Sequence, residues 1–145
     1  MGGIDTKRWL LGGLAAGVLI WLIEGLASML YMEDMKAAME PHGLSMEMTA
    51  GAFAIASIVS LLAGLTIVFI YAMARARLGP GPRTAVVAGV AFFLGSTLVS
   101  ILGWSMLGLF PARMLVTWAV VGLVEVVLAA LLGGYIYKEK PAASA

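Results

Sequence analysis

Apolar residues fill four long stretches of the chain, and short polar segments separate them. The stretches run approximately over residues 9–32, 49–74, 84–109 and 114–137. A helix of about 20 apolar residues crosses the ~30 Å hydrocarbon core of a bilayer, so each stretch is long enough to span it. The pattern therefore predicts an all-α fold, an integral membrane four-helix bundle. It would form a single domain over residues 1–145, with a longer loop over 33–48 and a shorter one over 75–83.

The composition excludes an ordinary soluble domain. Hydrophobic residues make up 62% of the chain and charged residues 12%, whereas soluble domains have about 45–50% and about 25%. Lys7 and Arg8 precede the first stretch, as in a signal peptide, but that stretch exceeds the ~7–15 apolar residues of a signal peptide. We therefore expect an uncleaved membrane anchor. The chain contains no cysteine, which excludes disulfides and thiolate metal sites.

Basic residues are distributed unequally between the two ends of the predicted bundle. One end would carry Lys7, Arg8, Arg75, Arg77, Arg83, Lys138 and Lys140. The opposite end has only Lys36 and Arg113. Because lysine and arginine accumulate in short cytoplasmic loops, this asymmetry predicts that both termini are cytoplasmic. The longer loop over residues 33–48 would then be external.

The predicted cytoplasmic loop lies within RARLGPGPRTA, residues 75–85, which contains two Gly-Pro pairs. Such pairs end a helix and favour a tight turn. Its arginines, Arg75, Arg77 and Arg83, fit a signal for membrane topology. The alternative role for them is binding of anionic lipid headgroups, although such sites usually hold clusters of about 4–8 basic residues.

Two acidic residues, Glu24 and Glu125, lie inside the predicted spans. An ionisable group in a bilayer is costly and normally faces the protein interior. Helical periodicity places each glutamate on the face of its span that also carries small and polar residues. At a rise of about 1.5 Å per residue, the two glutamates and several serines lie within roughly one helical turn in depth. The predicted intramembrane polar layer consists of Glu24, Glu125, Ser60, Ser96, Ser100, Trp21 and Trp118.

This layer has two interpretations. The predicted spans contain no lysine, arginine or histidine to neutralise the acids. Desolvation without a cation favours the neutral carboxyl, so we expect at least one glutamate to be protonated at neutral pH. Such a carboxyl suits a proton relay or a cation-coupled transporter. The structural alternative is that neutral glutamic acids donate hydrogen bonds to serine or backbone and help the helices associate.

Small residues recur four positions apart in each predicted span. The pairs are Gly13 and Gly17, Ser60 and Gly64, Ser96 and Ser100, and Ala129 and Gly133. This spacing lets helix backbones approach closely, so it predicts tight packing between spans. In the third span, helical periodicity also predicts that Gly89 and Gly103 share the face of the two serines.

Methionines gather in the connector SMLYMEDMKAAMEPHGLSMEM, residues 28–48, which holds six of the ten methionines and the only histidine. Helical spacing relates Met32, Met35 and Met39. This spacing predicts a short amphipathic helix that extends to Glu40, before Pro41 and Gly43 end it.

The methionines also have two interpretations. Thioether sulfur selects cuprous copper, and an imidazole can join it. The candidate ligands are Met32, Met35, Met39, His42, Met46 and Met48. Alternatively, flexible methionines fill irregular contacts where the short helix covers the bundle. Helical spacing fits both interpretations, and we favour the second, an adaptable lid.

The sequence lacks the patterns of the common enzyme classes. It has a single histidine, no HExxH motif and no phosphate-binding glycine loop before a helix. We therefore expect neither an enzymatic activity nor a cofactor.

The runs YAMARARLGPGPRTAVVAGVAFF, residues 71–93, and WAVVGLVEVVLAALLGGYIYKEK, residues 118–140, resemble a family of small bacterial inner-membrane proteins. Its members have four spans and no assigned activity, and the shared markers are the GPGPRT turn and the glutamate in the last span. The resemblance covers most of the chain and implies a helical bundle in a bacterial inner membrane. It implies no catalytic residue.

The segment WLIEGLASML, residues 21–30, is similar to the first span of the small multidrug resistance transporters. That likeness implies Glu24 as the acid that binds substrate and protons. The chain departs from these transporters in its long external loop, its second acid Glu125 and its greater length. A shared number of spans is an analogy of fold alone.

These observations lead to three functional hypotheses. The first is a non-enzymatic, multi-pass bacterial inner-membrane protein of unassigned function, such as an accessory subunit. It would sit in the lipid bilayer, self-associate or bind another membrane protein, and bind no nucleic acid. The second is a proton-coupled transporter of a small solute that uses Glu24 and Glu125. The third is a copper-handling membrane protein that uses the external methionines.

Overall fold

The computed structural model describes residues 4–45 and 47–137, and every regular segment in this part of the chain is helical. Four helical rods are long and apolar enough to cross a membrane, which confirms the predicted bundle. The rods are Thr6–Leu30, Ala50–Leu78, Pro82–Met106 and Ala112–Ile136. The segments are α1 (Thr6–Ala27), η1 (Ser28–Leu30), α2 (Met32–Met39), η2 (Glu40–His42), α3 (Ala50–Leu78), α4 (Pro82–Phe92), η3 (Phe93–Leu98), α5 (Val99–Met106) and α6 (Ala112–Ile136).

Capping side chains set where α1 and α3 begin. Asp5 precedes α1, and its carboxylate accepts a hydrogen bond of 3.1 Å from the Arg8 backbone N–H. Thr49 precedes α3, and its hydroxyl oxygen accepts a hydrogen bond of 3.1 Å from the Ala52 backbone N–H. These bonds satisfy N–H groups that the first turn of a helix leaves unpaired.

The turn between α3 and α4 is tighter than the predicted loop. Helix α3 continues to Leu78, so Arg75 and Arg77 are helical. Arginine is a good helix former, and the helix ends only at Gly79, whose positive φ of 79° disfavours other residues. The Thr84 hydroxyl donates a hydrogen bond of 2.7 Å to the Gly79 carbonyl and closes the turn.

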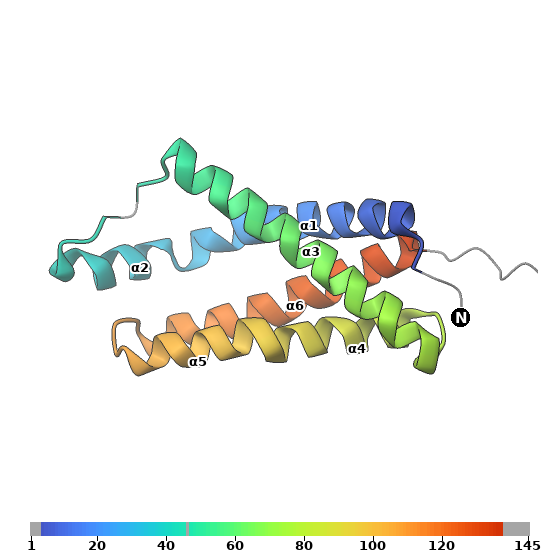
Figure 1. Cartoon of the computed structure of the whole chain (residues 1–145). Coiled ribbons are helices and arrows are strands. Elements are labelled where there is room, and N and C mark those ends of the chain that lie inside the picture. The colour runs from blue at the N-terminus through green and yellow to red at the C-terminus, as the bar shows by residue number, and fades with distance from the viewer. Residues whose placement is uncertain (1–3, 46, 138–145) are drawn as a thin grey trace, which may run out of the picture.

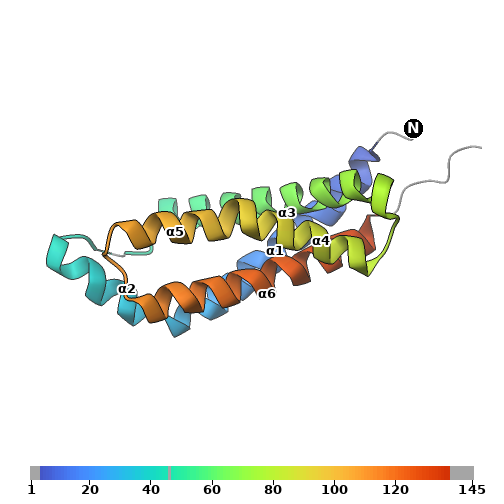
Figure 2. The same cartoon turned by 90° about the horizontal axis from the view of Figure 1, so that it is seen from below.

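The rods follow one another around the bundle. Helix α1 packs against α3 and α6, and α4 also packs against α3 and α6. Figures 1 and 2 show the antiparallel arrangement, and Figure 1 shows α3 crossing α1 obliquely. We call one end the terminus end, where α1 begins, α3 turns into α4 and α6 finishes. The other is the connector end, which holds α2 and the turn between α5 and α6.

Glycines allow α1 and α3 to cross in close contact. A Cβ atom added to Gly64 of α3 would overlap the backbone of Gly13 and Gly17 of α1. A Cβ atom at Gly17 would lie 2.6 Å from the Cα atom of Leu61, closer than real Cβ atoms approach. The structure therefore confirms the tight packing that the small-residue spacing of these two spans predicts.

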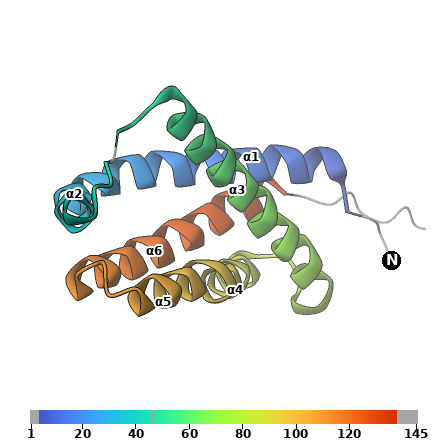
Figure 3. The same cartoon turned by 60° about the vertical axis from the view of Figure 1, so that its left-hand side comes forward.

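Packing is tight toward the terminus end and loose in the connector half of α3. The larger core cluster includes Ile67 and Val68 of α3 and Ala129 of α6, all fully buried. By contrast, Phe53 and Ile55 near the start of α3 are 50% and 65% exposed. Figures 1 and 3 show that α3 diverges from α5 toward the connector end.

The connector forms the predicted short helix. Helix α2 is followed by the 3-10 turn Glu40–His42 and by Gly43 in a left-handed conformation. Asp34 of α2 forms an ion pair with Arg113 at the start of α6. Met35 packs against a small core cluster at this end of the bundle. These contacts hold α2 against the rest of the protein.

The third rod contains a π-helical segment, η3, between α4 and α5. A π-helical turn is wider than an α-helical turn, so it rotates the residues that follow it relative to those before. The prediction that Gly89 and Gly103 share one face is therefore wrong. Gly89 is buried against α6, where an added Cβ would lie 2.9 Å from the Val126 carbonyl oxygen. Gly103 is exposed, with nothing within 4 Å of an added Cβ.

Candidate functional site

A groove lies between the four rods near the middle of their length. Its volume is about 330 Å³, and we call it the central groove. Its lining includes Glu24, Glu125, Ser60, Ser96, Ser100 and Trp118, which are six residues of the predicted polar layer. The structure thus brings the acids of the first and last rods to one site. Thr97 and Trp104 also line the groove, and sequence reasoning missed both.

Glu125 is a buried acid without a partner. It belongs to α6, and only 9% of its surface is exposed. Its enclosed Oε2 atom accepts no hydrogen bond from any described residue. The groove lining, as far as the structure describes it, contains no lysine, arginine or histidine. A buried acceptor without a donor is costly, so this oxygen favours a proton or a bound molecule that supplies a donor.

Glu24 has a different environment. Its Oε1 atom accepts a hydrogen bond from the Tyr31 hydroxyl. Tyr31 is 4% exposed, and its ring contacts that of Trp118 edge-on, with centroids 5.5 Å apart. The two acids are therefore unequal, because one has a fixed donor and the other has none. Tyr31 is absent from the predicted site, although its spacing of seven residues from Glu24, about two helical turns, pointed to the same face.

The hydroxyl groups of the groove are also unequal. The Ser60 hydroxyl of α3 donates a hydrogen bond of 3.0 Å to the Ala56 carbonyl, the usual arrangement for serine in a helix. The hydroxyls of Ser96, Thr97 and Ser100 form no hydrogen bond with any residue that the structure describes. The carbonyls four residues before them lie in or next to η3, where α-helical geometry is interrupted. These three hydroxyls therefore remain available to a ligand.

The central groove opens sideways between α3 and α5. Val59 of α3 is 58% exposed, and Ser96 and Ser100 are exposed on the opposite wall, although all three line the groove. The divergence of α3 from α5 in Figures 1 and 3 accounts for the opening. In a bundle that spans a membrane, an opening at this depth faces lipid chains rather than water.

A second cavity of about 280 Å³, the connector cavity, adjoins the central groove. The two share Glu24, Ser60 and Trp118 as lining residues. Trp21, which was predicted in the polar layer, lines the connector cavity and not the central groove. Its ring contacts Phe53 edge-on, with centroids 5.5 Å apart, because the oblique crossing brings the start of α3 toward this part of α1.

The candidate copper ligands are only partly brought together. Met32, Met35 and Met48 line the connector cavity, whereas Met39 and His42 do not. Met46 lies outside the described residues. Within residues 4–45 and 47–137, no group of three histidine, cysteine, aspartate or glutamate side chains is placed to hold a metal ion. The three methionines share the cavity wall with aromatic rings, which suits an apolar lid.

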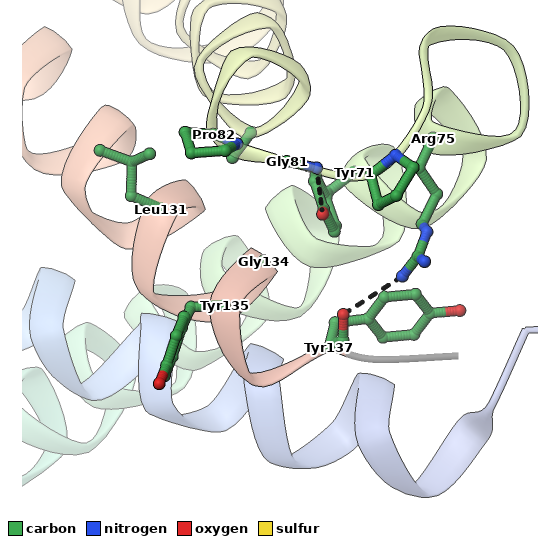
Figure 4. Close-up of a pocket in the computed structure, with 10 residues that line it drawn as sticks. Tyr71, Arg75, Gly81, Pro82, Leu131, Gly134, Tyr135 and Tyr137 are labelled. Atoms are coloured by element: carbon green, nitrogen blue, oxygen red, sulfur yellow. Dashed lines mark hydrogen bonds between the residues drawn. The ribbon is translucent and has the colours of Figure 1, made fainter. Parts of the chain in front are cut away.

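A third cavity, of about 460 Å³, lies at the terminus end beside the α3–α4 turn. Figure 4 shows Arg75 reaching across it to the end of α6. The Arg75 guanidinium donates a hydrogen bond of 3.2 Å to the Tyr137 carbonyl. It also lies over the rings of Tyr137 and Tyr71, at 5.3 and 5.9 Å from their centroids. The Gly81 N–H donates a hydrogen bond of 3.2 Å to the Tyr71 hydroxyl oxygen.

These contacts bear on the alternative that Arg75, Arg77 and Arg83 bind anionic lipid headgroups. Arg75 is half-buried and stabilises the turn, whereas Arg77 and Arg83 are exposed. The three therefore do not form one exposed basic cluster of the kind that anionic headgroups need. Lys138 and Lys140, the other basic residues expected at this end, lie outside the described residues.

The chain matches no protein-family model, no curated protein and no solved structure.

Proposed function

We propose that this protein is a proton-coupled carrier of a small solute, with the central groove as its binding site. Glu24 and Glu125 would be the groups that bind the solute or the proton. The observation that carries this function is the meeting of the two acids in one groove, with the Glu125 Oε2 atom lacking a donor. Acids inside a membrane are costly, and they commonly mark the path of an ion or substrate.

The uneven packing of α3 would let its connector half move relative to its terminus half. The terminus half of α3 lies in the main core, and glycines Gly13, Gly17 and Gly64 hold the crossing with α1. The connector half is loosely packed, as the exposure of Phe53 and Ile55 indicates. Motion of this half about the crossing would change access to the groove. A carrier requires a change of access to its binding site of this kind.

We further propose that the protein lies in a bacterial inner membrane with both termini in the cytoplasm. The four apolar rods support a multi-pass membrane protein. The orientation rests on the excess of lysine and arginine at the terminus end, and the bacterial membrane rests on the resemblance of residues 71–93 and 118–140.

Uptake into proteoliposomes tests the carrier. Vesicles holding the purified protein are given a mixture of small metabolites under an imposed pH gradient, and the accumulated solutes are identified by mass spectrometry. We expect at least one solute to accumulate, and a protonophore to abolish its accumulation. The variants Glu24→Gln and Glu125→Gln should lose this uptake while keeping their helical content, because glutamine cannot exchange a proton.

The matched control is Glu40→Gln, which removes a carboxylate in the connector that lines neither the groove nor the connector cavity. It should transport like the unmodified protein. Normal uptake by both groove variants would overturn the carrier. If no solute accumulates and an unrelated protein remains bound in native mass spectrometry, the accessory-subunit hypothesis replaces it.

A further inference from the structure

The side opening restricts how a ligand reaches the central groove. Val59 on one wall and Ser100 on the other are both exposed at the gap between α3 and α5. In a membrane this gap faces hydrocarbon, which a permanently charged molecule crosses only at a large cost. A ligand that arrives through the gap is therefore neutral and soluble in lipid.

The polar groups of the groove define what that ligand must donate. The buried Oε2 atom of Glu125 needs a hydrogen-bond donor and finds none among the described residues. The carboxylate of Glu24 already accepts a hydrogen bond from Tyr31. Ser96 and Ser100 add hydroxyls without a partner beside the gap. The fitting ligand carries a hydroxyl donor, directed at Glu125, on an otherwise apolar body.

The aromatic walls favour a flat ring. Trp104 and Trp118 line the groove, and Phe110 holds both indoles at centroid distances of 5.6 Å. The Tyr31 ring also contacts that of Trp118 edge-on. Aromatic rings prefer offset-stacked or edge-on contacts with one another. A volume of about 330 Å³ accommodates one substituted ring, and the side gap lets an alkyl tail extend into lipid.

We propose that the central groove binds a neutral, lipid-soluble phenol or hydroquinone, whose ring hydroxyl donates a hydrogen bond to Glu125. A phenol or hydroquinone would then be the solute of the proposed carrier, and its transport rests on that proposed function. The binding step stands separately on the groove geometry. The ligand enters from the bilayer between α3 and α5, and its ring lies against Trp104 and Trp118.

A matched pair of probes tests this ligand class in lipid nanodiscs. Para-heptylphenol has the donor, and its methyl ether, para-heptylanisole, has the same ring and tail without it. Binding is measured by ligand titration of the thermal unfolding midpoint, after correction for the lipid partitioning of each compound. We expect the phenol to bind about tenfold more tightly, the effect of one hydrogen bond to a buried carboxylate.

Variants at Glu125 test whether the preference for the phenol depends on this carboxyl group. Glu125→Met keeps an unbranched side chain and removes the acceptor, so the preference for the phenol should disappear. If that variant does not fold, Glu125→Gln serves instead, and its weaker neutral acceptor should reduce the preference about fivefold. Glu40→Gln should keep the full preference. A photoreactive phenol should label Val59 or Trp104 at the gap.

Four results would overturn the ligand class: equal affinity for phenol and anisole, an unchanged preference in the Glu125 variant, labelling only at other sites, or a second copy of the chain that covers the gap and excludes the phenol. Phenol binding without glutamate-dependent uptake would overturn the carrier and keep the ligand class. Uptake of a water-soluble solute by a protein that shows no preference for the phenol would overturn the ligand class and keep the carrier.

Discussion

The Tyr31 hydroxyl donates a hydrogen bond to Glu24 across a separation of seven residues, at the point where α1 gives way to the 3-10 turn η1. This bond makes the two intramembrane acids different. Glu24 has a donor from Tyr31, the residue that follows its own rod, whereas Glu125 on α6 has an enclosed oxygen without one. Glu125 is therefore the acid that needs a proton or a hydrogen-bond donor from a ligand, whereas Glu24 already has a donor within the fold.

Replacing Tyr31 by phenylalanine should destabilise the protein through Glu24. The change removes the hydroxyl donor and keeps the ring that packs against Trp118. A hydrogen bond between side chains inside a membrane contributes about 0.6–2 kcal/mol. We expect Tyr31→Phe and Glu24→Met, which removes the acceptor, to show a coupling of that size in a double-mutant cycle, measured by reversible unfolding in mixed micelles. Strictly additive effects of the two changes would contradict the bond.

Enlarging Gly64 should separate α1 from α3. A Cβ atom there meets the backbone of Gly13 and Gly17, which cannot move aside as a side chain can. We expect Gly64→Ala to lower the free energy of unfolding by about 1–3 kcal/mol. The control is Gly25→Ala in α1, where nothing lies within 4 Å of an added Cβ. That variant should be unchanged or slightly more stable, since alanine is the better helix former. An equal loss in both variants would contradict the close crossing.

The methionines of the connector cavity should behave as an apolar wall. We expect the combined change of Met32, Met35 and Met48 to leucine to alter the free energy of unfolding by less than about 1.5 kcal/mol per site, because leucine conserves their volume. The unmodified protein should bind no cuprous ion in competition with a chromogenic chelator. Cuprous binding that the triple variant loses, and that Met39→Leu keeps, would instead favour the copper-handling hypothesis.

Reporter fusions should place both termini on the cytoplasmic side. In a bacterial host, we expect a fluorescent protein fused after residue 145 to fluoresce, and alkaline phosphatase fused there to be inactive. Phosphatase inserted after Gly43 of the connector should be active, because that segment lies at the end with few basic residues. The opposite pattern would reverse the proposed orientation. Replacing Arg77 and Arg83 by glutamine should weaken the orientation while leaving Arg75 in its contacts with the turn.

The sequence alone determined the class of the fold. Long apolar stretches have few alternatives to membrane-spanning helices, because backbone groups in lipid must be satisfied within the segment. The small-residue spacings, Gly13 with Gly17 and Ser60 with Gly64, also predicted tight packing between spans, and the structure places these glycines at the close crossing of α1 and α3. Pro41 and Gly43 marked the end of the connector helix, since neither continues a helix readily. These features depend on local chemistry, which the sequence records directly.

The sequence also pointed to most of the polar residues that line the groove, because small and polar residues repeat along one face of each helix. It missed Tyr31, whose importance depends on where the chain bends after α1. Sequence periodicity also missed Thr97 and misplaced Gly103. No residue pattern predicted the π-helical segment, which rotates the end of the third rod relative to its start. A periodicity argument assumes a regular helix, and it fails where that regularity is interrupted.

Only the tertiary structure decided that Glu24 and Glu125 line one groove and that this groove opens between α3 and α5. Equal depth of the two acids in their spans is a one-dimensional property, whereas their meeting depends on the order and tilt of the helices. The oblique crossing at Gly64 sets that tilt, which closes the terminus half of the bundle and leaves the connector half of α3 apart from α5. The packing of a few glycines therefore determines where the acids meet and how a ligand reaches them.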